Sequence, residues 1–309
     1  KPKHQWLLGI EYEMFGQKDQ GQNPLPYEGK VSITNLFLHI IKKSQNFSDP
    51  YQPLLEGQNI VGLKCQRAII ALEPGGQIEV AMMPFSSLDD VTKLFSEVVL
   101  EIENASFDLG IKLFALGVHP MAKREDMAVV KKARYAIMRG YMSKLSGLGL
   151  DMMTRSCAIQ INLDYENEED MAQKMRKAAL LMPIYALICS SSAFIEGQPA
   201  PFALMRGQIW HETDPRRTGI PEIIFQKDFG YLSWINLALD VPMYFLRRDN
   251  QYFDVRGQSF RDFIKHGLLG KTATLRDFVD QLSTVFTDVR LKPIIELRSP
   301  DSLPVPYVN

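Results

Sequence analysis

The sequence predicts a fold of the α+β class, in which helices and strands are mixed along the chain. Three observations support this prediction. The 309 residues include 46% hydrophobic and 23% charged side chains, which is an ordinary globular composition. Strand-like and helix-like segments are interleaved irregularly, without the βαβ rhythm of a parallel sheet. The chain also has neither a GxGxxG nor a GxxxxGK[ST] motif, so a Rossmann or P-loop nucleotide site is not supported.

Six segments are expected to be strands, because each is short, rich in apolar residues and bounded by turn residues. In chain order they are residues 6–15, 68–73, 77–83, 112–118, 156–165 and 291–298. Five segments repeat apolar residues at helical spacing and are expected to be helices. In chain order they are residues 33–43, 88–102, 124–145, 168–191 and 274–286. Ser87 is expected to cap the second helix, since acidic residues follow it in the first turn.

Polar segments between these elements are expected to be surface loops. They cover residues 16–29, 46–58 and 197–219. The last is rich in Pro, Arg and Gly, and loops of that length are often functional. The most apolar stretch, residues 178–195, contains Pro183 and three consecutive serines. We therefore expect it to be a buried core helix rather than a membrane span.

Charge and cysteine content limit the partners and the compartment. With 35 basic and 36 acidic side chains, the net charge of −1 argues against a general nucleic-acid binder, which needs a basic surplus. Cys65, Cys157 and Cys189 fit neither a disulfide framework nor a metal motif, so a reducing compartment, the cytoplasm, is expected. No membrane partner is expected, and both a monomer and a homodimer stay open.

Polar side chains recur at every second position on four of the predicted strands. Side chains two apart on a strand share a face, so each of these strands has one polar face. The polar positions are Glu11 and Glu13; Gln77 and Glu79, with Glu73 before the turn; Gln160, Asn162 and Asp164; and Glu296 and Arg298. Amphipathic strands with wet outer faces would explain any one of them. They explain the set less well, because solvated faces usually carry Lys, Thr, Ser and Arg.

Massed carboxylates repel one another unless a cation neutralises them. Mg²⁺ is the expected cation because it prefers oxygen ligands, whereas five histidines without an HxxxH-type cluster disfavour zinc. A second, cationic group consists of Arg134, Arg206, Arg217 and Arg298. Guanidinium groups bind carboxylate and phosphate in a bidentate fork. Acidic metal ligands with arginines favour phosphoryl transfer from a nucleotide to a carboxylate, and leave a metal-dependent phosphatase or nuclease open.

Longer strings of the chain are specific enough to compare with known families. They include Gly9-Ile-Glu-Tyr-Glu-Met-Phe15, Ala71-Leu-Glu-Pro-Gly-Gly-Gln77, Arg134-Tyr-Ala-Ile-Met138, Gln160-Ile-Asn-Leu-Asp164, residues 206–219, Leu239-Asp-Val-Pro-Met-Tyr-Phe245 and Val289-Arg-Leu-Lys292. In this order they resemble the glutamate–cysteine ligases of the plant and proteobacterial type, which belong to the glutamine synthetase-like carboxylate–amine ligases. The resemblance extends from Gly9 to Asp301.

The resemblance implies a curved antiparallel sheet that forms a funnel, with helices packed outside. It implies a single catalytic domain over residues 1–309, without the helical region that the family has after Asp301. The implied reaction joins the γ-carboxylate of L-glutamate to the amino group of L-cysteine, the first step of glutathione biosynthesis. It uses ATP and Mg²⁺ and proceeds through γ-glutamyl phosphate.

The resemblance also assigns roles to residues of this chain. Those that resemble Mg²⁺ ligands are Glu11, Glu13, Glu79 and Glu296, with Glu73 and Gln160 close by. Those expected to bind substrate are Arg206, Trp210, Asn162 and Arg134. Arg217 and Arg298 are expected to meet phosphate as catalytic groups, and Lys64 and Arg298 to contact the nucleotide phosphates.

The chain departs from the family pattern at a few positions. Met14, Gln281 and Ser299-Pro300 stand where the family commonly has Lys, His and Gly-Ala. The run Ala81-Met82-Met83 replaces a smaller one and is expected to add apolar bulk beside Glu79. These departures leave the amine acceptor open. A ligase of the same fold with another acceptor, and a catalytically silent homologue, are therefore the alternatives.

Overall fold

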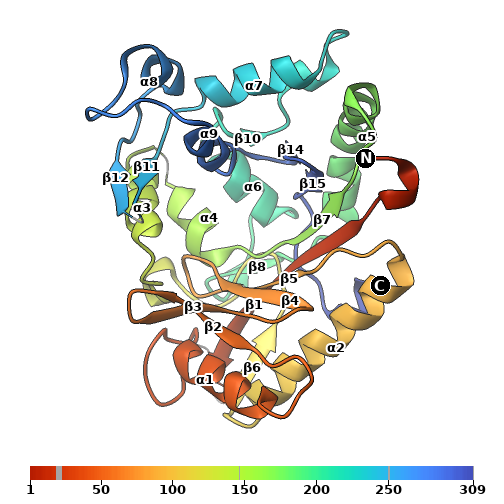
Figure 1. Ribbon diagram of the computed structural model, residues 1–309. Helices are drawn as coiled ribbons and strands as arrows, with labels where there is room; N and C mark the ends of the chain where they lie inside the picture. Colours follow the sequence, from red (N-terminus) through yellow and green to blue (C-terminus); the bar gives the residue numbers. More distant parts are fainter. Residues whose placement is uncertain (19–22, 146, 250, 309) are drawn as a thin grey trace.

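The computed structural model describes residues 1–18, 23–145, 147–249 and 251–308. Its main sheet contains the strands β1 (Leu8–Lys18), β2 (Gln52–Glu56), β3 (Asn59–Lys64), β4 (Ala68–Leu72), β5 (Ile78–Met82), β6 (Ile111–Phe114), β7 (Ile159–Leu163), β14 (Val289–Leu291) and β15 (Ile295–Leu297). The strand order is β14-β15-β7-β1-β5-β4-β3-β2, and β6 also pairs with β1 (Figure 1). All these pairings are antiparallel. The α+β prediction is confirmed.

The helices lie on both sides of this sheet. They are α1 (Ile33–Ser44), α2 (Leu88–Phe107), α3 (Ala133–Leu145), α4 (Gly149–Arg155), α5 (Glu168–Ile188), α6 (Met205–His211), α7 (Tyr231–Asp240), α8 (Phe260–His266) and α9 (Leu275–Leu282). Short 3-10 helices cover Lys3–Gln5, Arg124–Asp126, Glu222–Phe225 and Val305–Tyr307. Three small sheets pair β8 (Phe194–Ile195) with β9 (Gln198–Pro199), β10 (Thr218–Gly219) with β13 (Phe286–Thr287), and β11 (Phe245–Arg248) with β12 (Gln251–Asp254).

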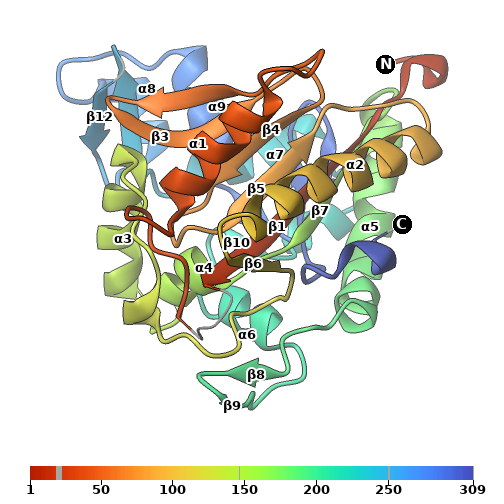
Figure 2. The same ribbon diagram turned by 90° about the horizontal axis from the view of Figure 1, so that it is seen from below.

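Helices α1 and α2 cover one face of the sheet (Figure 2). The polar side chains lie on the other face. The alternation along β1 decides this division. Tyr12 and Met14 are buried in the main core, and the Tyr12 ring meets Phe95 of α2 edge to face at 5.0 Å. Their neighbours Glu11 and Glu13 therefore point to the opposite face, because side chains alternate along a strand.

Several predicted boundaries are wrong. Residues 124–145 split into a 3-10 turn and α3, because the backbone between them bonds elsewhere, with the Val130 amide donating to Pro74. Residues 291–298 form two strands around Pro293, which cannot donate to a ladder. The predicted loop 46–58 contains β2, and 197–219 contains α6. Residues 19–22 of the predicted loop 16–29 lie outside the described residues.

The apolar stretch at residues 178–195 is not a fully buried core helix. It includes the C-terminal half of α5, where Ala179 and Met182 are buried but Leu187 and Ile188 are 63% and 72% exposed. The apolar residues of this stretch are therefore divided between the core and the exposed surface. None of the helices that the structure describes is long and apolar enough to cross a membrane.

Candidate active site

The polar face of the sheet lines a cavity of about 330 Å³. Four carboxylates line it: Glu11, Glu13, Glu73 and Glu79. Glu13 of β1 stands directly opposite Glu79 of β5, and Glu11 stands opposite Gln160 of β7 on the other side. Three neighbouring strands thus bring residues from distant parts of the sequence to one place. Of the predicted polar faces, the structure brings Glu11, Glu13, Gln77, Glu79, Gln160 and Arg298 to this cavity.

Glu73 reaches the cavity through the turn that joins β4 to β5. Gly76 in this turn has a φ of +86°, which residues with a side chain rarely adopt. Gly75 approaches α4 so closely that an added Cβ would lie 2.2 Å from the Thr154 carbonyl oxygen. The Gln77 side chain fixes the turn by accepting from the Gly75 amide and donating to the Ser156 carbonyl. Gln77 is therefore a positioning residue.

Burial and mutual repulsion raise the pKa values of two of these acids, Glu13 and Glu79. Burial raises the pKa of Glu13 from its ordinary 4.5 to about 7, and Glu73 adds to the effect. Burial also raises the pKa of Glu79 well above its ordinary value, with Glu73, Glu11 and Glu13 contributing. A cation bound beside Glu13 and Glu79 would favour their charged forms.

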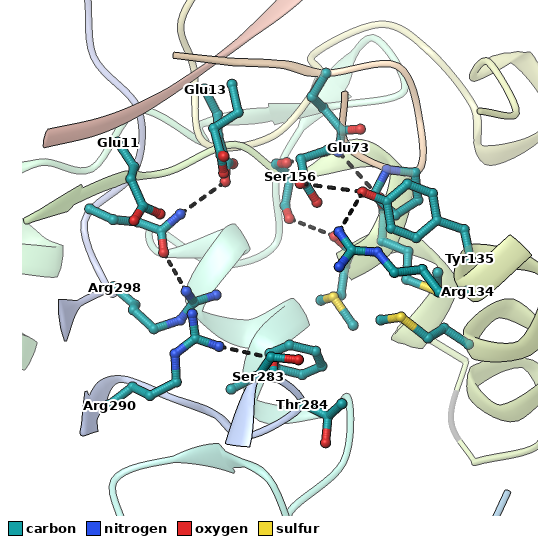
Figure 3. A pocket seen from close by; sticks show the side chains of 18 of the residues that line it. Glu11, Glu13, Glu73, Arg134, Tyr135, Ser156, Ser283, Thr284, Arg290 and Arg298 are labelled. Atoms are coloured by element: carbon teal, nitrogen blue, oxygen red, sulfur yellow. Dashed lines mark hydrogen bonds between the residues drawn. The ribbon is translucent and has the colours of Figure 1, made fainter. Parts of the chain in front are cut away.

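A chain of hydrogen bonds connects the carboxylates to an arginine. Arg298 donates to the Gln160 side-chain oxygen, and the Gln160 amide donates to Glu13 Oε1 at 3.1 Å (Figure 3). Glu13 Oε2 accepts from the Ala158 amide at 2.7 Å. Arg298 at one end and the backbone at the other therefore hold the Glu13 carboxylate in place.

Cations lie across the cavity from the acids. Figure 3 shows Arg290 and Arg298 on this side, and Lys292 also lines the cavity. All three bind Glu296: Arg290 Nε at 2.5 Å, Lys292 Nζ at 2.6 Å and Arg298 Nη1 at 2.9 Å. We call Arg290, Lys292 and Arg298 the cationic wall, and Glu11, Glu13, Glu73 and Glu79 the anionic wall.

The position of Glu296 does not support its predicted role as a Mg²⁺ ligand. Its side chain is fully buried behind the cavity. Burial alone would raise the pKa of Glu296, but Arg290, Arg298 and Lys292 hold it well below its ordinary value. Both carboxylate oxygens are already bound to these cations. Glu296 is therefore the counter-ion that fixes the cationic wall.

A second cavity, of about 230 Å³, adjoins the first. Trp210, Phe286 and Arg298 line both cavities and form the wall between them. Arg206 lines the second cavity and is 4% exposed. Its guanidinium donates to the carbonyls of Ser299 and Arg298, and its Cζ lies 5.6 Å from the centre of the Trp210 ring. The structure thus brings the predicted substrate residues Arg206 and Trp210 together.

Two further predicted substrate residues differ in their access to the site. Arg134 lines the first cavity, where its guanidinium donates to the Tyr135 hydroxyl at 3.3 Å. Asn162 does not line either cavity, and its amide donates to Glu11 Oε1 at 2.8 Å. Asn162 therefore orients a carboxylate of the anionic wall.

The structure does not place Arg217 or Lys64 at the site. Arg217 is fully buried, pairs with Asp214 at 2.9 Å and donates to the carbonyls of Thr284 and Pro242. Its predicted contact with phosphate is not supported, because these partners occupy its donors. Lys64 is exposed at the end of β3 and lines neither cavity.

Sequence reasoning missed Arg290 and Lys292 as individual site residues. The available signal was their spacing of two on either side of apolar Leu291, the last residue of β14. Their importance depends on the hairpin that folds β14 onto β15, which pairs Arg290 with Glu296 in register. The prediction of a single strand over 291–298 hid this pairing.

The departures from the family pattern mostly lie outside the cavities. Met14 and Met82 are buried in the core, Met83 is 43% exposed, and only Ala81 of that run lines the first cavity. The prediction of added apolar bulk beside Glu79 is therefore wrong. Gln281 donates to the carbonyls of Ala238 and Val241, which ties α9 to α7.

A family model described as glutamate-cysteine ligase family 2 matches residues 7–308. The chain belongs to this family. It is 37% identical over 307 residues to the chloroplastic glutamate–cysteine ligase of Medicago truncatula. The aligned region covers 98% of this chain and 59% of that protein. The chloroplastic glutamate–cysteine ligase of Arabidopsis thaliana is 36% identical, and the aligned region covers 98% of this chain and 57% of that protein. The chain thus spans less than two thirds of the length of these relatives.

A solved structure supports the fold. The glutamate–cysteine ligase of Francisella tularensis, in complex with AMP, superposes with a TM-score of 0.50 at 12% identity, covering 96% of this chain and 61% of that one. The predicted cytoplasmic location, in contrast, is wrong. The curated relatives that contradict it are named as chloroplastic enzymes.

Proposed function

We propose that this family member forms an amide bond between the γ-carboxylate of L-glutamate and the amino group of L-cysteine, at the expense of ATP. The observation that carries the proposal is the division of the first cavity into an anionic and a cationic wall. Magnesium nucleotides need both, since the metal takes oxygen ligands and the phosphates need cations. The Francisella enzyme was solved with AMP, and an adenine nucleotide is proposed here too.

The second cavity would hold the amino-acid end of the substrate. Arg206 is a buried cation suited to a carboxylate, and it lies directly behind Trp210 and Arg298. The apolar faces of Trp210 and Phe286 suit the methylene groups of glutamate. A glutamate held in this way would present its γ-carboxylate to the first cavity, between the two walls.

The chemistry requires activation of a carboxylate, which is a poor electrophile. One γ-carboxylate oxygen attacks the γ-phosphorus of ATP, the bond to ADP breaks, and γ-glutamyl phosphate forms. The amine then attacks the carbonyl carbon, loses a proton, and phosphate leaves with the former carboxylate oxygen. Arg298 and Arg290 would stabilise the charge on the transferring group. Their contacts with Glu296 and Gln160 fix them before the reaction begins.

The anionic wall fits Mg²⁺ in its donor chemistry. Glu11, Glu13, Glu73 and Glu79 supply only oxygen, and a cation would relieve the repulsion that raises the pKa of Glu13 and Glu79. When bound, the ion would neutralise negative charge on the nucleotide phosphates. Among the described residues, no three acidic, His or Cys side chains are gathered tightly enough to hold an ion as they stand. These side chains would therefore have to close around it.

The acceptor is the least constrained part of the proposal. The curated relatives are named as glutamate–cysteine ligases, and this favours L-cysteine and a place at the first step of glutathione biosynthesis. A ligase with another acceptor is the second candidate, because Ala81 is a departure that does line the first cavity. No protein nucleophile is required, so the buried thiol of Cys157 has no catalytic role in this scheme.

The test is phosphate release from ATP with L-glutamate and a panel of amines. Cysteine-dependent release supports the proposal, release with a different amine only supports the second candidate, and no release with any amine contradicts both. Glu79→Gln should abolish release by removing a carboxylate of the anionic wall. The matched control is Glu97→Gln, the same change at an exposed position on α2, which should leave the rate unchanged.

A further inference from the structure

The second cavity contains a polar group that the proposed reaction does not yet use. Asp288 lines this cavity together with Arg206 and Ser299. Its backbone is fixed on both sides, since its amide donates to the Gly219 carbonyl at 2.9 Å and its carbonyl accepts from the Arg298 amide at 2.9 Å. Asp288 thus lies between β13 and β14 at the rim of the main sheet. Its position is set by the fold and not by a flexible loop.

The carboxylate of Asp288 has no ion-pair partner among the described residues. Burial raises its pKa, although Arg206, Ser299, Arg298 and His211 act in the opposite direction. None of these cations, nor any other in the part of the chain that the structure describes, lies within ion-pair distance of its carboxylate. The Arg206 guanidinium donates instead to the backbone carbonyls of Ser299 and Arg298. The Arg298 guanidinium pairs instead with Glu296. A half-buried carboxylate without a cation is costly, unless a ligand supplies the cation.

Residues that line the same cavity also have unpartnered donors. Within the described ranges, Arg206 Nε and Trp210 Nε1 are buried and have no hydrogen-bond acceptor. Ser299 stands where the resembled family commonly has Gly, so this chain adds a hydroxyl there. The cavity therefore combines an unpaired anion with unpaired donors. The ligand that satisfies both has a cationic nitrogen next to an anionic oxygen, which is the head group of an α-amino acid.

We propose that Asp288 binds the α-ammonium group of the amino acid whose γ-carboxylate is activated, while Arg206 binds its α-carboxylate. This inference rests on the proposed function, because it places the head group of the same L-glutamate in the second cavity. Trp210 and Phe286 separate that cavity from the first, where the γ-carboxylate reacts. It adds a specificity rule: the site takes an α-amino dicarboxylate and rejects a dicarboxylate without the amine. Glutarate, which is glutamate without its α-ammonium group, is the probe.

The test compares Asp288→Asn with Asp228→Asn, the same change at an exposed position. We expect Asp288→Asn to raise the KM for L-glutamate about 30-fold or more, the effect of leaving one partner of a buried charge pair alone. The KM for ATP and kcat should stay within about twofold, because the ammonium contact is the same in the ground and transition states. Asp228→Asn should behave as the wild type.

The wild-type protein provides a second arm that does not depend on folding of a variant. It should prefer L-glutamate to glutarate by about 30-fold or more, and Asp288→Asn should lose that preference. An unchanged KM for L-glutamate, a raised KM for the acceptor amine instead, or equal use of glutarate by the wild type would overturn the inference. If the wild type releases no phosphate with any amine, the proposed function fails. Calorimetric binding of L-glutamate and glutarate then decides the inference on the same criterion.

Discussion

Replacing Glu13 by Gln should make the metal-free protein more stable at pH 8 and not at pH 5. Glu13 is buried among other carboxylates, and its pKa is raised from 4.5 to about 7. An acid with a raised pKa in the folded state destabilises that state as pH rises from 4.5 to 7, and the full cost is present above pH 7. A pKa of about 7 in place of 4.5 corresponds to about 3 kcal/mol.

The substitution also has a cost that does not depend on pH. Glu13 accepts hydrogen bonds from the Ala158 amide and from Gln160, and a glutamine side chain has only one oxygen for these two donors. Losing one acceptor in a buried position costs about 1–2 kcal/mol. The expected net effect of Glu13→Gln is therefore a gain of about 1–2 kcal/mol at pH 8 and a small loss at pH 5.

Urea unfolding in the presence of a chelator, at pH 5 and pH 8, measures these free energies directly. Glu97→Gln is the matched control, because Glu97 is exposed on α2 and its change should not depend on pH. Added Mg²⁺ should stabilise the wild type at pH 8 more than it stabilises Glu13→Gln. A variant that is equally destabilised at both pH values would refute the reasoning, since Glu13 would then be an ordinary hydrogen-bonded carboxylate.

Three other predictions follow from the same geometry. Glu296→Gln should lower the free energy of unfolding by about 3 kcal/mol or more, because three cations would lose a buried counter-ion. Urea unfolding measures this change, and a loss below about 1 kcal/mol would contradict the prediction. Mg²⁺ affinity, measured by calorimetry, should rise between pH 6 and 8, because binding displaces protons from Glu13 and Glu79; a flat profile would argue against these ligands. Lys64→Ala should leave the KM for ATP within about twofold, as expected of an exposed side chain outside the cavities. A large rise would restore the sequence-based prediction.

The sequence was sufficient to predict the anionic wall because strand alternation is local. Glu11 and Glu13 share a face whatever the neighbouring strands are, and the buried Tyr12 and Met14 on the other face determine which side meets the core. The same reasoning placed Gln160 on the polar face of its own strand, and the pairing of β7 with β1 brings it opposite Glu11. Periodicity therefore predicted which side chains converge, once the strands pair as they do.

The roles of the charged residues could not be predicted in the same way. Glu296 looked like a metal ligand until the turn at Pro293 brought Arg290 and Lys292 against it. Arg217 looked like a phosphate ligand, but its burial beside Asp214 depends on the packing of a loop of 197–219 that the sequence leaves unspecified. A charge in a sequence has no partner until tertiary structure supplies one, and that partner decides its function.

The central claim is that the two walls activate a γ-carboxylate by phosphorylation. The most direct measurement uses L-glutamate labelled with ¹⁸O in both γ-carboxylate oxygens, ATP, Mg²⁺ and L-cysteine, with mass spectrometry of the phosphate released. An acyl phosphate route predicts one ¹⁸O atom in each phosphate, because the carboxylate oxygen that attacks phosphorus leaves with it. Phosphate without ¹⁸O would mean that water, and not the γ-carboxylate, attacks ATP, and it would contradict the account.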